Sequence, residues 1–288
     1  MKILVTGATG QLGAKVVEAL LAKVPAKQLA VSVRDPEKAR AFSARGVDVR
    51  RGDFEDPASL EPAFAGVERL LIVSTQGDND TRIRQHLAAV AAAQRAGVQL
   101  IAYTSVVNAA HNSLELAPVH KATEEAIAKT GIPYVFLRNN WYIENETGTI
   151  QGILAGAPLV TSAGEGKVGW ATREDYAQAA AAVLTGNGHE NKIYELSGTP
   201  IPHAELARII GEALGREVPV QHVDDANYAD VMRGAGVPEP VVPFLVSIQR
   251  SIREGALDVP SGDLETLLGR PATPLVEAVR DIVKDLQA

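Results

Sequence analysis

The stretch L-V-T-G-A-T-G-Q-L-G, residues 4–13, decides the fold of this chain. It opens as a short hydrophobic run, places glycines at a G-x-x-G-x-x-G spacing, and leads into apolar residues that recur at helical period over residues 12–21. Gly7 permits a tight turn, Gly10 leaves room for a pyrophosphate, and Gly13 lets the helix pack closely on the strand. The pattern predicts a dinucleotide phosphate site at a helix N-terminus. Its expected members are Gly7, Thr9, Gly10, Gln11, Leu12 and Gly13.

The composition is that of an ordinary globular enzyme, with 46% hydrophobic and 22% charged residues among 288. No apolar run reaches the roughly 18 residues of a membrane span, so we expect a cytoplasmic protein without membrane insertion. The formal charge of −7 and the lack of a Lys/Arg block argue against nucleic acid as a partner. With no cysteine and no metal-ligand spacing among the histidines, no bound metal is expected.

Further strands are expected at residues 29–33, 47–50, 70–73, 100–104 and 134–137, each separated from the next by a helical pattern. Six strands with intervening helices predict an α/β fold, a Rossmann-type, doubly wound parallel sheet. Right-handed crossovers bring the carboxyl ends of such strands to one edge, where ligands bind. Polar or glycine-rich clusters follow each strand, so the cofactor is expected along this edge.

Arg34 follows the second strand, where dinucleotide folds select the cofactor. An arginine there accommodates a 2′-phosphate, so NADPH is favoured over NADH. Asp35 complicates this interpretation, because an acidic residue there would bind ribose hydroxyls; alternatively Asp35 caps the helix that begins at Pro36. The remaining predicted cofactor contacts are Asp53, Phe54, Ser74, Thr75, Gln76 and Asn139.

Beyond residue 146 strands and helices no longer alternate regularly. Residues 1–146 are predicted to form the NAD(P)-binding domain, and residues 147–288 mainly a smaller α+β substrate lobe, with the helix at 173–184 returning to the sheet. The short strand candidates at 159–160, 192–196 and 218–222 are assigned to this lobe. The predicted substrate contacts are Asn140, Trp141 and Tyr142; the two aromatic rings would stack on a flat molecule or belong to an interdomain core.

Several motifs are specific when taken together: G-A-T-G-Q-L-G from Gly7, V-R-D-P-E-K-A from Val33, L-R-N-N-W-Y-I-E-N from Leu137 and A-T-R-E-D-Y-A from Ala171. On these motifs the chain resembles the NmrA-like, atypical branch of the short-chain dehydrogenase/reductase superfamily, and most closely its bacterial type 2 NAD(P)H:quinone oxidoreductases. The resemblance implies an NADPH-binding Rossmann domain, a small C-terminal substrate domain and quinone reduction without flavin. Related members reduce triphenylmethane dyes or act as non-catalytic redox sensors.

The superfamily's usual Tyr-x-x-x-Lys pair is missing, because no tyrosine has a lysine four residues later. Ser105 stands where the family's serine would be, while His120 and Glu124 occupy the expected tyrosine and lysine positions. Ser105 and His120 are therefore the candidate catalytic residues, His120 as a proton donor or, alternatively, as a surface histidine. Loss of a general acid–base costs about 10²–10⁴ in rate. Quinone reduction tolerates this loss, because water can protonate the stabilised oxyanion.

The sequence is compatible with two functions. The first is an NADPH-dependent, flavin-free reductase that transfers hydride to a quinone-like, small planar acceptor. The second is an NmrA-like redox-sensing regulator that binds NADP(H) and a protein partner without turnover. The Trp141–Tyr142 pair beside Asn139 and Asn140 favours the small acceptor. A homodimer is compatible with either function.

Overall fold

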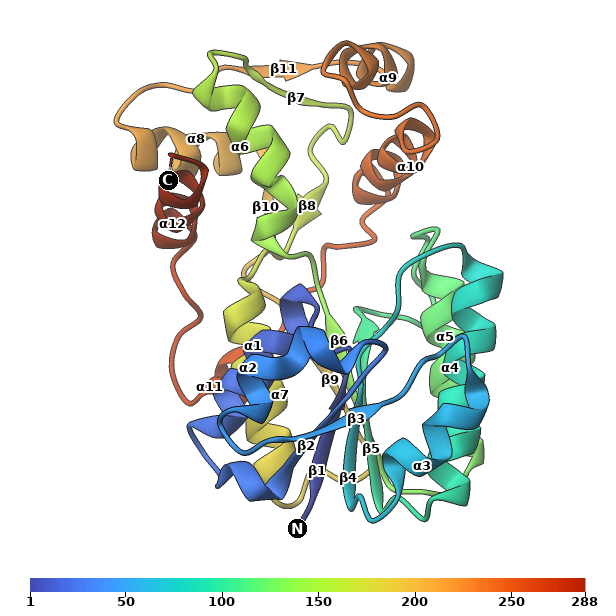
Figure 1. Ribbon diagram of the computed structural model, residues 1–288. Helices are drawn as coiled ribbons and strands as arrows, with labels where there is room; N and C mark the ends of the chain where they lie inside the picture. Colours follow the sequence, from blue (N-terminus) through green and yellow to red (C-terminus); the bar gives the residue numbers. More distant parts are fainter. Residues whose placement is uncertain (288) are drawn as a thin grey trace.

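The computed structural model describes residues 1–287, which form a seven-stranded sheet with the strand order β3-β2-β1-β4-β5-β6-β9. Every neighbouring pair in this sheet is parallel. The predicted Rossmann-type α/β fold is confirmed, and the carboxyl ends of the strands face the smaller lobe in Figure 1. The strands are β1 (Ile3–Thr6), β2 (Leu29–Val33), β3 (Asp48–Arg51), β4 (Arg69–Ile72), β5 (Leu100–Val106), β6 (Tyr134–Asn139) and β9 (Lys192–Leu196).

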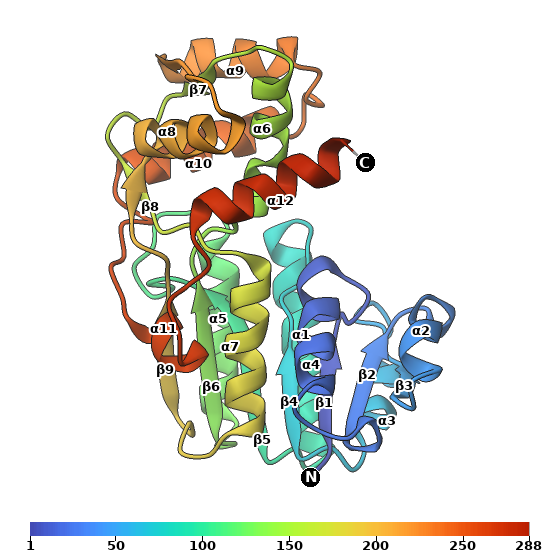
Figure 2. The same cartoon turned by 90° about the vertical axis from the view of Figure 1, so that its left-hand side faces the viewer.

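Helices cover both faces of the sheet (Figure 2). The side chains of β1 alternate between two cores: Ile3 and Val5 pack in the core with α1 and α7, whereas Leu4 packs in the core with α3, α4 and α5. Burial on both faces is what a strand inside a parallel sheet requires. One layer contains α1 (Gln11–Leu21), α2 (Arg40–Ser43), α7 (Arg173–Thr185) and α11 (Asp263–Leu268); the other contains α3 (Leu60–Phe64), α4 (Asn79–Arg95) and α5 (Ala117–Lys129).

The strand candidate at 192–196 was wrongly assigned to the smaller lobe. It is β9, and it pairs in parallel with β6, with Tyr194 beside Leu137. The reason is topological: α7 carries the chain back along the sheet, so β6, α7 and β9 form a crossover unit that places its second strand next to the first. The sheet therefore has seven strands where the sequence pattern predicted six.

The smaller lobe lies above the carboxyl ends of the strands (Figure 1). Its core surrounds Trp170, Ile150, Leu206 and Val279 and extends to the segment that follows β5. Its helices are α6 (Thr147–Leu154), α8 (His203–Leu214), α9 (Asp225–Gly234), α10 (Val242–Arg253) and α12 (Leu275–Gln287). Two strand pairs complete it, β7 (Leu159–Thr161) with β11 (Val220–His222) and β8 (Lys167–Val168) with β10 (Ile201–Pro202). Short 3-10 helices are η1 (Ala26–Gln28), η2 (Pro36–Ala39), η3 (Pro57–Ser59) and η4 (Ile143–Glu146).

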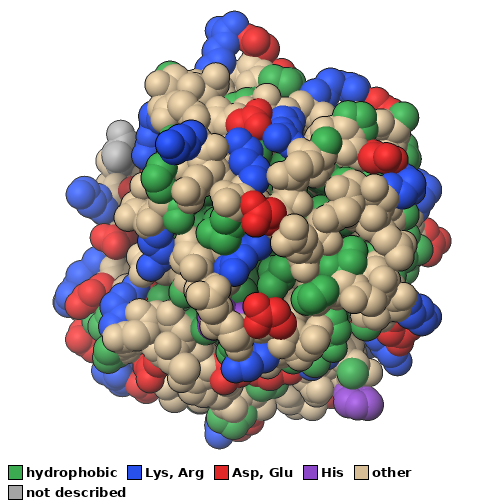
Figure 3. Space-filling view, turned by 90° about the horizontal axis from the view of Figure 1, so that it is seen from below, with side chains coloured by type: hydrophobic (Ala, Val, Ile, Leu, Met, Phe, Trp, Pro, Cys, Tyr) green, Lys and Arg blue, Asp and Glu red, His purple; other side chains and the backbone are tan. Residues whose placement is uncertain are grey.

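The face at the amino ends of the strands carries basic and acidic side chains interspersed with one another (Figure 3). Such mixing creates no large field of one sign on this face. Within residues 1–287, every helix is too short or too polar to cross a lipid bilayer.

Candidate active site

One cavity of about 1950 Å³ runs along the carboxyl ends of the central strands and continues beneath α9 and α10 of the smaller lobe. A pocket for one small molecule usually measures about 300–1,000 Å³, so this cavity has room for a dinucleotide and a second ligand. All the residues that the sequence predicted to bind or to act line it. The described part of the chain contains no cluster of three or more His, Asp or Glu residues that would hold a metal ion.

The glycine turn has the geometry of a phosphate site. Gly7 has a φ of 61°, in the left-handed region that favours glycine, and its N–H donates to the carbonyl of Ser32 at 3.2 Å. A Cβ at Gly13 would lie 2.2 Å from the carbonyl oxygen of Gly7, so α1 packs directly against the turn. Gly10 is the N-cap of α1 and no side chain caps this end. The first N–H groups of α1 are therefore available to an anion.

Two cations line the cavity just beyond β2. Arg34 and Lys38 are exposed, and neither forms an ion pair with any residue in 1–287. Asp35 is occupied locally, because its Oδ1 accepts the N–H of Glu37 at 3.1 Å and so caps η2. The helix cap that the sequence offered as the alternative role of Asp35 is therefore present. Sequence reasoning missed Lys38, which η2 presents on the cavity side one turn after Arg34.

Hydrogen bonds hold the loops after β3 and β4, within the first loop and from the second loop to β5 and α4. The Asp53 carboxylate accepts the N–H of Glu55 at 3.0 Å, and half-buried Phe54 packs against the core beneath α3 and α4. The N–H of Ser74 donates to Thr104 Oγ1 at 2.9 Å. The N–H of Thr75 donates to His86 Nε2 at 3.0 Å, and Gln76 follows on the exposed side. Both loops therefore present pre-ordered walls to the cavity.

Asn139, at the end of β6, carries an unused acceptor. Its Nδ2 donates to the hydroxyl of Tyr142 at 3.1 Å, whereas its buried Oδ1 has no partner in the described chain. The Tyr142 ring is held edge-on against Tyr176, and its centroid lies 4.8 Å from the guanidinium carbon of Arg173.

Several buried polar atoms around the cavity have no partner. Four of the seven buried polar side-chain atoms that lack a partner in residues 1–287 belong to cavity residues: Ser32 Oγ, Arg82 Nε, Gln85 Oε1 and Asn139 Oδ1. Buried polar groups normally have partners, so these four atoms, on β2, α4 and β6, are exceptions that gather around the cavity.

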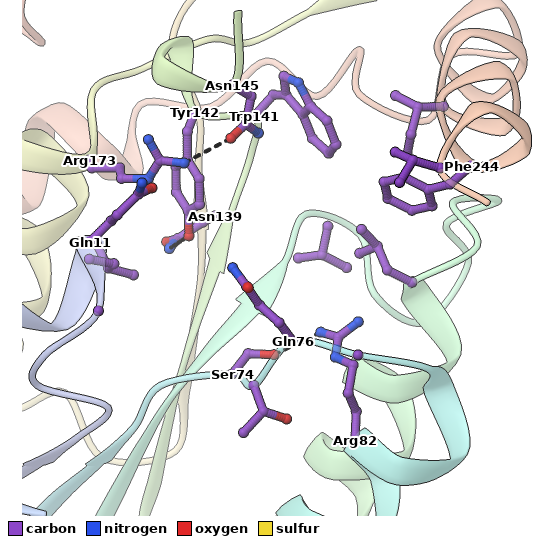
Figure 4. A pocket seen from close by; sticks show the side chains of 18 of the residues that line it. Gln11, Ser74, Gln76, Arg82, Asn139, Trp141, Tyr142, Asn145, Arg173 and Phe244 are labelled. Atoms are coloured by element: carbon purple, nitrogen blue, oxygen red, sulfur yellow. Dashed lines mark hydrogen bonds between the residues drawn. The ribbon is translucent and has the colours of Figure 1, made fainter. Parts of the chain in front are cut away.

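Asn140 and Trp141 have different surroundings. The Nδ2 of Asn140 donates to Ser197 Oγ at 2.9 Å and to the carbonyl of Leu257 at 3.0 Å, and its Oδ1 accepts the N–H of Trp141. This amide therefore joins the sheet to the smaller lobe rather than pointing freely at a ligand. The Trp141 ring is half-buried, packs partly on the core of the smaller lobe, and faces the cavity opposite Phe244 of α10 (Figure 4).

The smaller lobe closes the cavity with an apolar wall from α9 and α10 that sequence reasoning missed. Three of the six large hydrophobic side chains that are exposed in residues 1–287 line the cavity here. Grouped exposed apolar side chains mark binding sites on soluble proteins. The helical pattern near residues 241–253 predicts α10, but not which of its faces remains open. The wall comprises Val231 and Met232 of α9, Val241 immediately before α10, and Phe244, Leu245 and Ile248 of α10.

Ser105 lies within β5, and its hydroxyl proton is already used in a hydrogen bond. Its Oγ donates to Glu124 Oε1 at 2.6 Å. The other oxygen of Glu124 pairs with Arg138 at 2.7 Å, and Arg138 also binds Glu195 at 2.8 Å. The carboxylate of Glu124 is thus held between Ser105 and Arg138. Ser105 can still accept a hydrogen bond from a molecule in the cavity.

His120 is buried, so the alternative of a surface histidine is wrong. Its Nδ1 lies 2.9 Å from the Tyr103 hydroxyl, and its Nε2 lies 3.4 Å from Arg82 Nη2. Burial, followed by the charge of Arg82, holds the pKa of His120 well below its ordinary value. His120 is therefore neutral at pH 7 and is not an imidazolium acid.

The fold and the cavity define a Rossmann-type, dinucleotide-binding protein with a second, apolar chamber beside the cofactor groove. The chain belongs to the NmrA-like family, whose model matches residues 1–282.

Three relatives cover nearly the whole chain. Quinone oxidoreductase 2 of Escherichia coli (strain K12) is 40% identical over 278 residues, covering 96% of this chain and 97% of the relative. Its structure in complex with NADPH has a TM-score of 0.93 over 98% of this chain and 99% of that chain. The Citrobacter sp. triphenylmethane reductase complexed with NADP(H) is 44% identical, with a TM-score of 0.94 over 98% of this chain and all of that chain. The NAD(P)H azoreductase of Xenophilus azovorans is 31% identical over 96% of both chains.

Proposed function

We propose that this protein is an NADPH-dependent, flavin-free reductase that transfers hydride to a quinone or a similar small conjugated acceptor. One observation carries the proposal: a single cavity connects the glycine turn with the apolar chamber of the smaller lobe, so cofactor and acceptor would share one space. The quinone reductase, dye reductase and azoreductase among the relatives support it. The regulator alternative is not favoured.

Bound NADPH supplies the hydride. The N-terminus of α1 would hold its pyrophosphate, and Arg34 with Lys38 its 2′-phosphate. Asn139 Oδ1 is suited to accept an N–H from the nicotinamide carboxamide, with Tyr142 keeping the amide oriented. The residues present therefore fit the cofactor at both ends.

We propose that water supplies the proton. The Tyr-x-x-x-Lys pair is missing, Ser105 is bound to Glu124, and His120 is neutral and buried. Oxidation of an alcohol needs a base that removes the hydroxyl proton, whereas a reduced quinone is a stabilised oxyanion that picks up a proton after the hydride has moved. The site is therefore suited to reduction of conjugated acceptors and unsuited to alcohols.

The direct test uses flavin-free protein and follows the absorbance of NADPH with and without a simple benzoquinone. Rapid oxidation only in the presence of the quinone is expected, and secondary alcohols should not be oxidised with NADP⁺. Tight NADPH binding without turnover of any quinone would instead support the redox-sensing regulator. A cytoplasmic location and a homodimer remain predictions.

Replacing Arg34 by glutamate should weaken NADPH binding by about 10- to 100-fold, because a charge-assisted contact is worth roughly 1.5–3 kcal/mol. NADH has no 2′-phosphate, so its affinity should change little. Fluorescence titrations with both cofactors measure the difference. Equal losses for NADPH and NADH would show that Arg34 does not contact the 2′-phosphate.

Replacing Trp141 by alanine should raise KM for the quinone several-fold and leave kcat nearly unchanged. A stacking wall is lost equally from the ground state and the transition state, which removes uniform binding. Trp141→Phe is the matched control, since it keeps an aromatic face and should stay close to the wild type. A large fall in kcat with an unchanged KM would contradict this role.

A further inference from the structure

Arg82, in the first turn of α4, is the one buried arginine of residues 1–287, with 9% of its surface exposed. No carboxylate of the described residues lies within 4.0 Å of its guanidinium. Its Nη2 donates to Ser74 Oγ at 2.9 Å, while its buried Nε has no partner. An unpaired buried charge costs several kcal/mol. Such a charge is characteristic of sites where the protein needs an electrostatic effect.

The groups around this guanidinium do not neutralise it. Ser74 is a neutral hydroxyl, His120 is a neutral imidazole, and the Tyr103 hydroxyl behind His120 is deeply buried. Burial lowers the pKa of Arg82, but a guanidinium remains protonated in proteins. The wall of the cavity therefore carries a full positive charge.

The charge points into the cavity. Figure 4 shows the Arg82 side chain rising from α4 with its guanidinium beside Gln76, below the space that Trp141 and Phe244 enclose. Arg82 lines the same cavity as Ser105 and the apolar wall of α10. Arg82 binds Ser74, which follows β4, whereas Arg34 follows β2, and β1 lies between these two strands in the sheet. A molecule bound against the apolar wall would present its polar edge to Arg82.

We propose that the Arg82 guanidinium donates a hydrogen bond to a carbonyl oxygen of the acceptor and stabilises the negative charge that forms on it during reduction. This inference rests on the proposed function and names the acceptor class: neutral carbonyl compounds rather than cations. The hydride carries two electrons from NADPH, which becomes NADP⁺, to the quinone, which becomes the hydroquinone anion. One proton from water then completes the hydroquinone. The same charge repels a cationic acceptor.

Binding of two coloured probes in the presence of NADP⁺ tests the charge without turnover. 4-Nitrophenol should bind to the wild type mainly as its phenolate, so its apparent pKa should be lower than in free solution. The Arg82→Met variant should lose this shift and bind the phenolate at least about 10-fold more weakly. It should bind a cationic triphenylmethane dye as tightly as the wild type or more tightly. Arg82→Lys, which keeps the charge, should retain part of the phenolate preference.

Kinetics provide the second measurement. In Arg82→Met, kcat/KM for benzoquinone should fall by about 10²–10³-fold, the cost of removing a preorganised donor to a developing oxyanion. The Kd for NADPH should not change, which also shows that the variant is folded. Arg95→Met is the matched control: it is the same substitution on α4, at an exposed residue paired with Glu61, and should behave as the wild type.

Three results would overturn the role of Arg82: equal losses for phenolate and dye, weaker NADPH binding, or unaltered quinone turnover in Arg82→Met. In the last case the reductase function stands and only the inference fails. If the wild type turns over no quinone but selects the phenolate through Arg82, the proposed function fails and the oxyanion site remains.

Discussion

A Gly10→Val variant is expected to fold like the wild type and to lose NADPH affinity by more than about 100-fold. Gly10 has a φ of −83°, which any residue adopts, and an added Cβ would lie 3.2 Å from the carbonyl oxygen of Gly7, a close contact that a small shift relieves. The branched side chain would then occupy the space at the N-terminus of α1. Losing two charge-assisted hydrogen bonds to phosphate costs about 3–6 kcal/mol.

Gly13→Ala is the contrasting variant. Its Cβ would lie 2.2 Å from the carbonyl oxygen of Gly7 and 2.8 Å from the carbonyl carbon, so the backbone must move. We expect a loss of about 1–3 kcal/mol in the free energy of unfolding. Thermal unfolding and a fluorescence titration with NADPH measure both properties for both variants. If Gly10→Val keeps its affinity for NADPH, the phosphate does not lie at this turn.

The free energy of unfolding should fall steeply as the pH drops below about 6.5. Burial, followed by a neighbouring Arg82, lowers the pKa of His86 to about 3, and burial, followed by His222, lowers that of His203 to about 4. The pKa of His120 is also well below its ordinary value. These imidazoles stay neutral in the folded state, whereas in the unfolded chain they take up protons below about pH 6.5. Acid therefore favours the unfolded state, and stability is fully present above pH 6.5.

The free energy of unfolding should depend steeply on pH because three buried histidines contribute together. Each histidine contributes up to about 1.4 kcal/mol per pH unit, so the three together contribute at most about 4 kcal/mol per pH unit as the pH falls below 6.5. Urea unfolding at pH 7, 6 and 5 measures this slope. A His203→Gln variant should remove about a third of it. A stability that stays flat from pH 7 to pH 5 would contradict the neutral, buried histidines.

Local sequence patterns predicted the glycine turn, the six strands from β1 to β6 and the edge of the sheet along which the predicted cofactor residues lie. These features depend on local properties: the backbone freedom of glycine, the spacing of apolar residues and the right-handed crossover. The placement of Arg34 after β2 follows from the same rules. For this reason the fold class, and the position of every candidate residue along the cavity, could be predicted without coordinates.

Which side chains are buried, and what they contact, could be seen only once the chain was folded. β9 joins the sheet because α7 returns to it, and Asn140 is used to connect the two lobes. The unpaired charge of Arg82 and the burial of His120 arise where α4 and α5 pack beside the end of β4, and Phe244 reaches the cavity from a segment more than a hundred residues away. The burial of a side chain and the partners of a polar group depend on elements that are distant in the chain, so no local sequence pattern predicts them.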